Sequence, residues 1–164
     1  MEVIFMRHGK AEEPGDLVLS DAERALTGEG RKKVENAAPG IAQFIRCGSS
    51  AVMIWSSPLL RAKQTAEIVA SNLGKIKIQH YEAIAAGDLD MLIKEWGRLG
   101  DDVTLIIVGH EPYLSHWAEK LAGVRLVFKK GACAGFDVAV TNPAEGRLKW
   151  YATASILARL AKGK

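Results

Sequence analysis

The chain has few of the residues on which disulfide-rich, zinc-binding and membrane proteins depend. Its 164 residues include only two cysteines, Cys47 and Cys133, which are far apart and form no C-x-x-C pair. We therefore expect neither a disulfide framework nor a zinc cluster, and this cysteine usage suits a reducing cytosol. No apolar run approaches the roughly 20 residues of a membrane span. Glu2 and the short apolar run before Arg7 do not resemble a signal peptide, so we expect a soluble, cytoplasmic protein.

Neither positive nor negative charge predominates in the sequence. The formal net charge is only +3, and the basic clusters are confined to residues 31–33 and 129–130. Neither cluster is flanked by aromatic residues on which bases could stack, so both are interpreted as solvated faces. The composition therefore favours neither nucleic acid nor a membrane as a partner.

Patterns typical of buried strands alternate with helical patterns along most of the chain. Continuous apolar runs predict strands at 2–6, 51–55 and 103–109, and alternation predicts another at 75–81. Helices are expected from a Thr27 N-cap to about Gly48, from Leu59 to about Leu73, after an Asp88 cap, and from Pro112 through Leu121. Pro39 predicts a kink or an early break in the first of these helices. Shorter strands are expected at 125–129, 135–140 and 146–152.

This alternation predicts an α/β fold. Strands that alternate with helices form a mainly parallel sheet with helices on both faces, a three-layer α/β/α sandwich. No repeat, low-complexity segment or linker divides the sequence, so we expect one domain over residues 1–164.

Three of the predicted buried strands end in residues that can carry chemistry. Arg7, His8 and Gly9 follow the first strand, two serines and Arg61 follow the second, and His110 follows the strand at 103–109. In open α/β sheets, functional sites form beyond the carboxyl ends of parallel strands. Each residue taken singly could be a structural or surface residue, but two histidines and two arginines at such positions predict one shared pocket.

The predicted pocket suits phosphoryl transfer. Two guanidinium groups can hold a phosphate, and a neutral imidazole can attack phosphorus to form a phosphohistidine. The second nitrogen of the His8 ring must then donate to a fixed acceptor, which a carbonyl folded back at Gly9 could supply. A carboxylic acid that protonates the leaving oxygen is sought at Glu82, which follows the strand at 75–81, with Asp88 and Glu111 as lesser candidates.

The motifs closely resemble those of the histidine phosphatase superfamily, the phosphoglycerate mutase-like group. They occur in the family's order as FMRHGKAE, RALTGEG, SSPLLRAKQTAEIV, YEAIAAGD and IIVGHEP, from the first strand to about residue 117. The short length and the tail from residue 129 onward look most like the SixA-type phosphohistidine phosphatases. The resemblance implies a phosphoglycerate mutase-like fold and a metal-independent phosphatase without cofactors, with inorganic phosphate as product.

The resemblance also implies roles for individual residues. His8 would be the nucleophile, Arg7 and Arg61 phosphate ligands, and His110 the second catalytic histidine, which also contacts substrate. Glu82 matches the acid/base glutamate, a step that a phosphoramidate substrate can dispense with. One further residue, Arg24, would lie near the pocket rim as a substrate-binding group.

Several other chemistries are excluded, and two alternatives remain open. Leu114 stands where a zinc-binding H-E-x-x-H motif needs its second histidine. Neither cysteine is followed by an arginine six residues later, and there is no P-loop. The expected substrate is a histidine-phosphorylated protein in signal transduction. The open alternatives are a small phosphate ester as substrate and a non-catalytic phospho-binding module.

Overall fold

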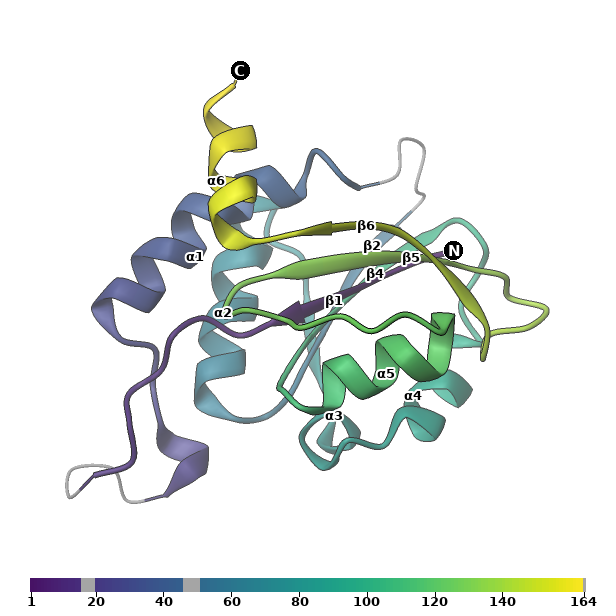
Figure 1. The fold of residues 1–164 in the computed structure, drawn as a ribbon, viewed down its shortest axis with the longest axis horizontal. Coiled ribbons are helices and arrows are strands. Elements are labelled where there is room, and N and C mark those ends of the chain that lie inside the picture. The colour runs from purple at the N-terminus through teal and green to yellow at the C-terminus, as the bar shows by residue number, and fades with distance from the viewer. Residues whose placement is uncertain (16–19, 46–50, 164) are drawn as a thin grey trace.

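The computed structural model describes residues 1–15, 20–45 and 51–163, and Figure 1 shows the arrangement of their helices and strands. The elements follow one another as β1 (Glu2–Arg7), the short 3-10 helix η1 (Asp21–Glu23), α1 (Gly28–Ile41), β2 (Ala51–Ser56), α2 (Leu60–Asn72), β3 (Ile78–His80), α3 (Glu82–Ala86), α4 (Leu89–Trp96), β4 (Val103–Gly109), α5 (Tyr113–Ala122), β5 (Cys133–Val138), β6 (Gly146–Ala152) and α6 (Ala154–Lys162).

One mainly parallel sheet organises the described part of the chain. Its strand order is β3-β2-β4-β1-β5-β6, and the pairs β3–β2, β2–β4 and β4–β1 are parallel. Strand β5 runs antiparallel to β1, and β6 runs antiparallel to β5. The two central strands, β1 and β4, are the runs that the sequence marked as continuously apolar, because helices cover both of their faces.

Two hydrophobic cores, one on each face of the sheet, make the fold three-layered. Phe5, Trp55 and Ile107 point into the core shared with α3, α4 and α5. Ile4, Ile54 and other side chains of the opposite face pack against α1, α2 and α6. Figure 1 shows these two groups of helices on either side of the strands. The predicted α/β/α sandwich is therefore confirmed.

Side-chain caps fix the starts of two predicted helices. The Thr27 hydroxyl accepts from the Gly30 amide at 2.9 Å at the start of α1, and the Asp88 carboxylate accepts from the Met91 amide at 3.0 Å at the start of α4. Each cap satisfies an amide that the first helical turn leaves without a partner. The start of α5 after Pro112 and the end of α2 before Gly74 also agree with the prediction to within one residue.

Three sequence-based expectations about the elements were wrong. Helix α1 ends at Ile41 and so does not reach the expected end at Gly48, which, like Cys47, lies outside the described residues; the early break expected at Pro39 is confirmed. Residues 125–129 form no strand, and only three residues of the predicted strand at 75–81 pair as β3.

The C-terminal helix α6 was not predicted. It packs against α1 so closely that a Cβ atom on Gly40 would stand 2.0 Å from the Leu157 carbonyl oxygen. Its own residues carried a local signal that could have revealed it, since the Thr153 hydroxyl caps the first turn by accepting from the Ile156 amide at 3.4 Å. Among the described residues, no helix is long and apolar enough to cross a membrane.

Candidate active site

The carboxyl ends of β1, β2 and β4 meet at one edge of the sheet, as the sequence predicted. Arg7 pairs with Gly109 in the β1–β4 register, so the two histidines that follow these strands emerge side by side. The ring centroids of His8 and His110 are 5.1 Å apart. Arg61 enters from the first turn of α2, and its charge acts on both imidazoles. The four predicted residues therefore gather at this edge.

His8 is held as a neutral imidazole with a defined tautomer. Its Nδ1 lies 2.7 Å from the Gly9 carbonyl oxygen, which can only accept, so Nδ1 carries the proton and Nε2 keeps its lone pair. Burial is the main cause that lowers the pKa of His8 to about 3, and the nearby cations act in the same direction. The expected contact with the Gly9 carbonyl is confirmed, and Nε2 is unprotonated at neutral pH, as a nucleophilic imidazole requires.

Backbone contacts fix the loop that carries this imidazole. The His8 amide donates to the Gly109 carbonyl at 3.1 Å, and the Gly131 amide donates to the His8 carbonyl at 3.2 Å. Gly9 is required here because a Cβ atom would stand 2.7 Å from a methyl group of Val34 in α1. The His8 loop is thus held by β4, by the turn before β5 and by α1.

Thr65, a buried residue of α2, joins the His8 loop to the arginine helix. Its hydroxyl accepts from the Gly9 amide at 3.1 Å and donates to the Arg61 carbonyl at 2.8 Å. The sequence analysis gave Thr65 no role. Its position four residues after Arg61, one helical turn along the same face, was the signal that could have revealed it.

The two arginines are anchored by different segments. Arg7 donates from Nη1 to the Phe128 carbonyl at 2.8 Å, so the irregular segment before β5 holds its guanidinium. Arg61 donates from Nη1 to the Asp21 carbonyl at 2.7 Å and from Nη2 to the Asp21 carboxylate at 3.0 Å. Arg24, expected near the rim, contacts the same carboxylate. Neither the Phe128 carbonyl nor Asp21 was predicted from the sequence.

The ring nitrogens of His110 make no hydrogen bond to the described residues. Both nitrogens are buried, and Nε of Arg7 is likewise buried without a hydrogen-bond partner in this part of the chain. Burial first, and the Arg61 charge second, lower the pKa of His110 to about 4. Buried polar groups without partners are costly and concentrate at functional sites. An anion that accepted hydrogen bonds here would satisfy them.

Glu82, the predicted acid/base residue, is exposed, and its role stays a prediction. Glu82 is the exposed first residue of α3, and no hydrogen bond or ion pair joins it to another described residue. The lesser candidates are engaged elsewhere, since Asp88 caps α4 and Glu111 accepts from the Ser115 hydroxyl. Within the described ranges, no carboxyl group therefore contacts either imidazole.

The two buried histidines predict a fall in stability in mild acid. Their folded pKa values, about 3 and about 4, lie below the value of 6.5 expected in the unfolded chain. As the pH falls below 6.5, the unfolded state binds protons that the folded state does not, so the free energy of unfolding decreases. The expected slope is about 1.4 kcal/mol per pH unit for each histidine.

Urea unfolding between pH 7.5 and pH 5 measures this slope. The variant His110→Gln removes one of the two groups and should reduce the slope by about half. A free energy of unfolding that stays constant from pH 7 to pH 5 would contradict the neutral, buried state of both imidazoles.

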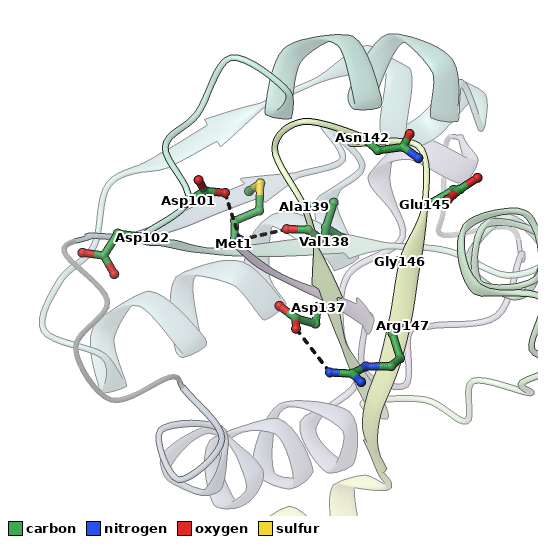
Figure 2. A pocket seen from close by; sticks show the side chains of 10 residues that line it. All are labelled: Met1, Asp101, Asp102, Asp137, Val138, Ala139, Asn142, Glu145, Gly146 and Arg147. Carbon is green, nitrogen blue, oxygen red and sulfur yellow. Dashed lines mark hydrogen bonds and ion pairs between the residues drawn. The ribbon is translucent and has the colours of Figure 1, made fainter.

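A hollow of about 740 Å³ lies at the opposite edge of the sheet, next to Met1 and the start of β4 (Figure 2). Its carboxylates include Asp101, Asp137 and Glu145, and the ion pairs there are those of the Met1 ammonium with Asp101 and of Arg147 with Asp137. An acidic lining disfavours a phosphate. The hollow is also remote from the carboxyl strand ends, so it is not the phosphate site.

Comparisons with known proteins agree with this geometry. An uncharacterized protein of Picosynechococcus sp. (strain ATCC 27264 / PCC 7002 / PR-6) is 35% identical over 143 residues, a match that covers 82% of this chain and 84% of that protein. The structure of the protein histidine phosphatase SixA complexed with tungstate has a TM-score of 0.81 at 22% identity and covers 94% of this chain and 98% of that one.

A mycobacterial glucosyl-3-phosphoglycerate phosphatase with inorganic phosphate has a TM-score of 0.69 at 16% identity, over 94% of this chain and 99% of that one. The structural matches establish the phosphoglycerate mutase-like fold expected from the sequence. The family model of the histidine phosphatase superfamily (branch 1) matches residues 3–121. With that match over most of its length, the chain belongs to the histidine phosphatase superfamily.

Proposed function

We propose that this protein is a phosphatase that removes the phosphoryl group from phosphohistidine on another protein. Nε2 of His8 attacks phosphorus, the bond from phosphorus to the substrate's ring nitrogen breaks, and that nitrogen keeps the electron pair and takes a proton from solvent. Water then attacks the phosphohistidine formed on His8. The P–N bond breaks, Nε2 recovers its lone pair, and inorganic phosphate leaves.

The arrangement of the four residues supports each part of this reaction. His8 is neutral and its Nδ1 proton is fixed, so Nε2 is available for in-line attack. Arg7 and Arg61 supply guanidinium donors for the phosphoryl oxygens. His110 presents ring nitrogens with no other partner and can stabilise charge on the transferring group.

The observation that carries the phosphohistidine assignment is the position of the carboxyl groups. In the described part of the chain, Glu82 contacts neither imidazole, and Asp21 is ionised because Arg24 and Arg61 lower its pKa. An ester needs an acid to protonate its leaving oxygen. The ring nitrogen of phosphohistidine is easily protonated by solvent, so a site whose candidate acid, Glu82, is exposed and makes no ion pair with the described residues suits phosphohistidine better than an alkyl phosphate ester.

The expected result is a preference for the phosphoramidate. The value of kcat/KM for a histidine-phosphorylated carrier protein should exceed that for an alkyl phosphate ester such as glycerol 2-phosphate, whose leaving oxygen must be protonated, by roughly 10²-fold, the lower end of what general acid catalysis contributes. Glu82→Gln should change neither value by more than about twofold, because the exposed carboxyl group makes no hydrogen bond or ion pair with the described part of the site. Phosphate release is measured with EDTA present throughout, and omission of EDTA is the control.

Each contrary result has a distinct meaning. Equal rates on both substrates, or a large loss for Glu82→Gln on the ester alone, would assign the enzyme to small phosphate esters. Phosphate release from neither substrate would leave a phospho-binding module. Loss of activity on addition of EDTA would contradict a metal-independent reaction.

A further inference from the structure

Asp21 joins Arg61 and the rim arginine Arg24 into one unit. Its backbone carbonyl accepts from Nη1 of Arg61 at 2.7 Å, and carboxylate oxygen Oδ2 accepts from Nη2 at 3.0 Å. The other carboxylate oxygen, Oδ1, accepts from Nη1 of Arg24 at 2.8 Å. Arg24 is held from a second side, because its Nε donates to the Glu12 carbonyl. The carboxylate therefore bridges a buried arginine and a rim arginine.

The local fold delivers Asp21 to this position. It is the first residue of η1, and its carbonyl also accepts from the Arg24 amide at 3.3 Å, which closes the turn. The side chain of Arg61 is only 8% exposed, whereas that of Asp21 is 62% exposed. Asp21 is thus the exposed partner of an ion pair whose other member, Arg61, is buried in the site.

The charges within this unit fix what Asp21 can do. Hydrogen bonds from Arg24 first, and then from Arg61, lower its pKa, so it is an anion at neutral pH and cannot serve as a proton donor. Its negative charge is close enough to His110 to oppose the pKa-lowering effect of Arg61 there. Asp21 is therefore within electrostatic range of the phosphoryl site without touching either imidazole.

We propose that Asp21 is a positioning residue, which orients Arg61 for the incoming phosphoryl group. The guanidinium of Arg61 has five N–H donors, and two of them are engaged by Asp21. The remaining donors keep a fixed direction, and an arginine held in this way loses less conformational entropy when it binds an anion. This inference rests on the proposed function only in that Arg61 binds the phosphoryl group.

If Asp21 instead blocked the site, its removal would change the affinity for phosphate in the opposite direction. If the carboxylate occupied the position that phosphate must take, its removal would tighten the binding of phosphate. The geometry favours positioning, because a carboxylate whose charge is offset by Arg24 leaves the other Arg61 donors available. The affinity of the protein for inorganic phosphate therefore distinguishes the two roles.

The experiment compares Asp21→Ala and Asp21→Asn with the unaltered protein. The inhibition constant of inorganic phosphate and the KM for p-nitrophenyl phosphate should rise about tenfold in Asp21→Ala. Asp21→Asn, which keeps a side-chain oxygen acceptor and the carbonyl contact, should recover most of this loss. In an Arg61→Gln background, Asp21→Ala should have almost no additional effect, because Asp21 acts through Arg61.

Asp90→Ala is the matched control. Asp90 is an exposed carboxylate paired with Lys120 away from the site, and its replacement should leave both constants unchanged. Tighter phosphate binding in Asp21→Ala, or an undiminished loss in the Arg61→Gln background, would overturn the proposal, as would no change at all. Phosphate binding, measured by calorimetry, reports on Asp21 even if the protein hydrolyses no substrate, so failure of the proposed function remains distinguishable.

Discussion

Replacement of His8 by alanine is expected to abolish turnover, with kcat reduced roughly 10⁴-fold or more, as for other catalytic nucleophiles. The imidazole supplies the only lone pair that the described site directs from a fixed tautomer, because Nδ1 is committed to the Gly9 carbonyl. The arginines offer no lone pair, and among the described residues nothing fixes the tautomer of His110, whose ring nitrogens have no hydrogen-bond partner. Steady-state phosphate release and trapping of an acid-labile phosphoenzyme measure the effect.

His80→Ala serves as the control for this experiment. His80 is an exposed histidine at the end of β3, on the far side of the sheet order from β1, and its loss should leave turnover unchanged. Circular dichroism and urea unfolding show whether His8→Ala is still folded. Wild-type rates, or an acid-labile phosphoenzyme that persists in the folded His8→Ala protein, would show that another residue is the nucleophile.

The sequence predicted the floor of this site because chain direction alone determines where strand ends meet. Arg7 ends the buried strand β1, and His8 and His110 directly follow β1 and the parallel strand β4. Because Arg7 pairs with Gly109, the two histidines are neighbours. The caps of α1 and α4 were predictable for a similar reason, since a capping side chain acts within three residues of itself.

The supports around the floor were not predictable, because they depend on contacts between distant segments. Asp21 reaches Arg61 across 40 positions, and the Phe128 carbonyl reaches Arg7 across 121. No periodicity marks a backbone carbonyl as a ligand. The packing of α6 on Gly40 of α1 is long-range in the same way, although the Thr153 cap that starts this helix was a local signal.

Glu82 shows the limit of position in sequence as a guide. Glu82 follows β3, as the motif requires. However, β3 is short and α3 begins almost immediately after it, so that Glu82 is the exposed first residue of this helix. The carboxyl group of Glu82 makes no hydrogen bond or ion pair with His8 or His110, and its part in protonating the leaving oxygen of an ester stays a prediction. The substrate preference proposed above depends on this difference and not on the resemblance of the motifs.

Arg61→Lys is expected to lower kcat/KM by roughly 10² to 10³-fold, the usual cost of removing a donor that stabilises transition-state charge. A lysine keeps the positive charge but has one ammonium group, which cannot bond both Asp21 and the phosphoryl oxygens in a fixed plane. The loss should appear in kcat as well as in KM, because the charge on the phosphoryl oxygens changes during transfer. Single-turnover kinetics with the histidine-phosphorylated carrier separate the effect on substrate binding from the effect on phosphoryl transfer.

Arg98→Lys provides the matched comparison. Arg98 also pairs with a carboxylate, that of Glu95, but it is 63% exposed and lies outside the site, so the change should have no effect on kcat/KM. Arg61 is buried, so hydrogen-bond acceptors that a lysine leaves without a donor cannot bind water instead. The substitution should therefore reduce activity more at this position than at an exposed one. If Arg61→Lys and Arg98→Lys gave equal rates, charge alone would account for Arg61, and neither its planar fork nor the orientation imposed by Asp21 would contribute to phosphoryl transfer.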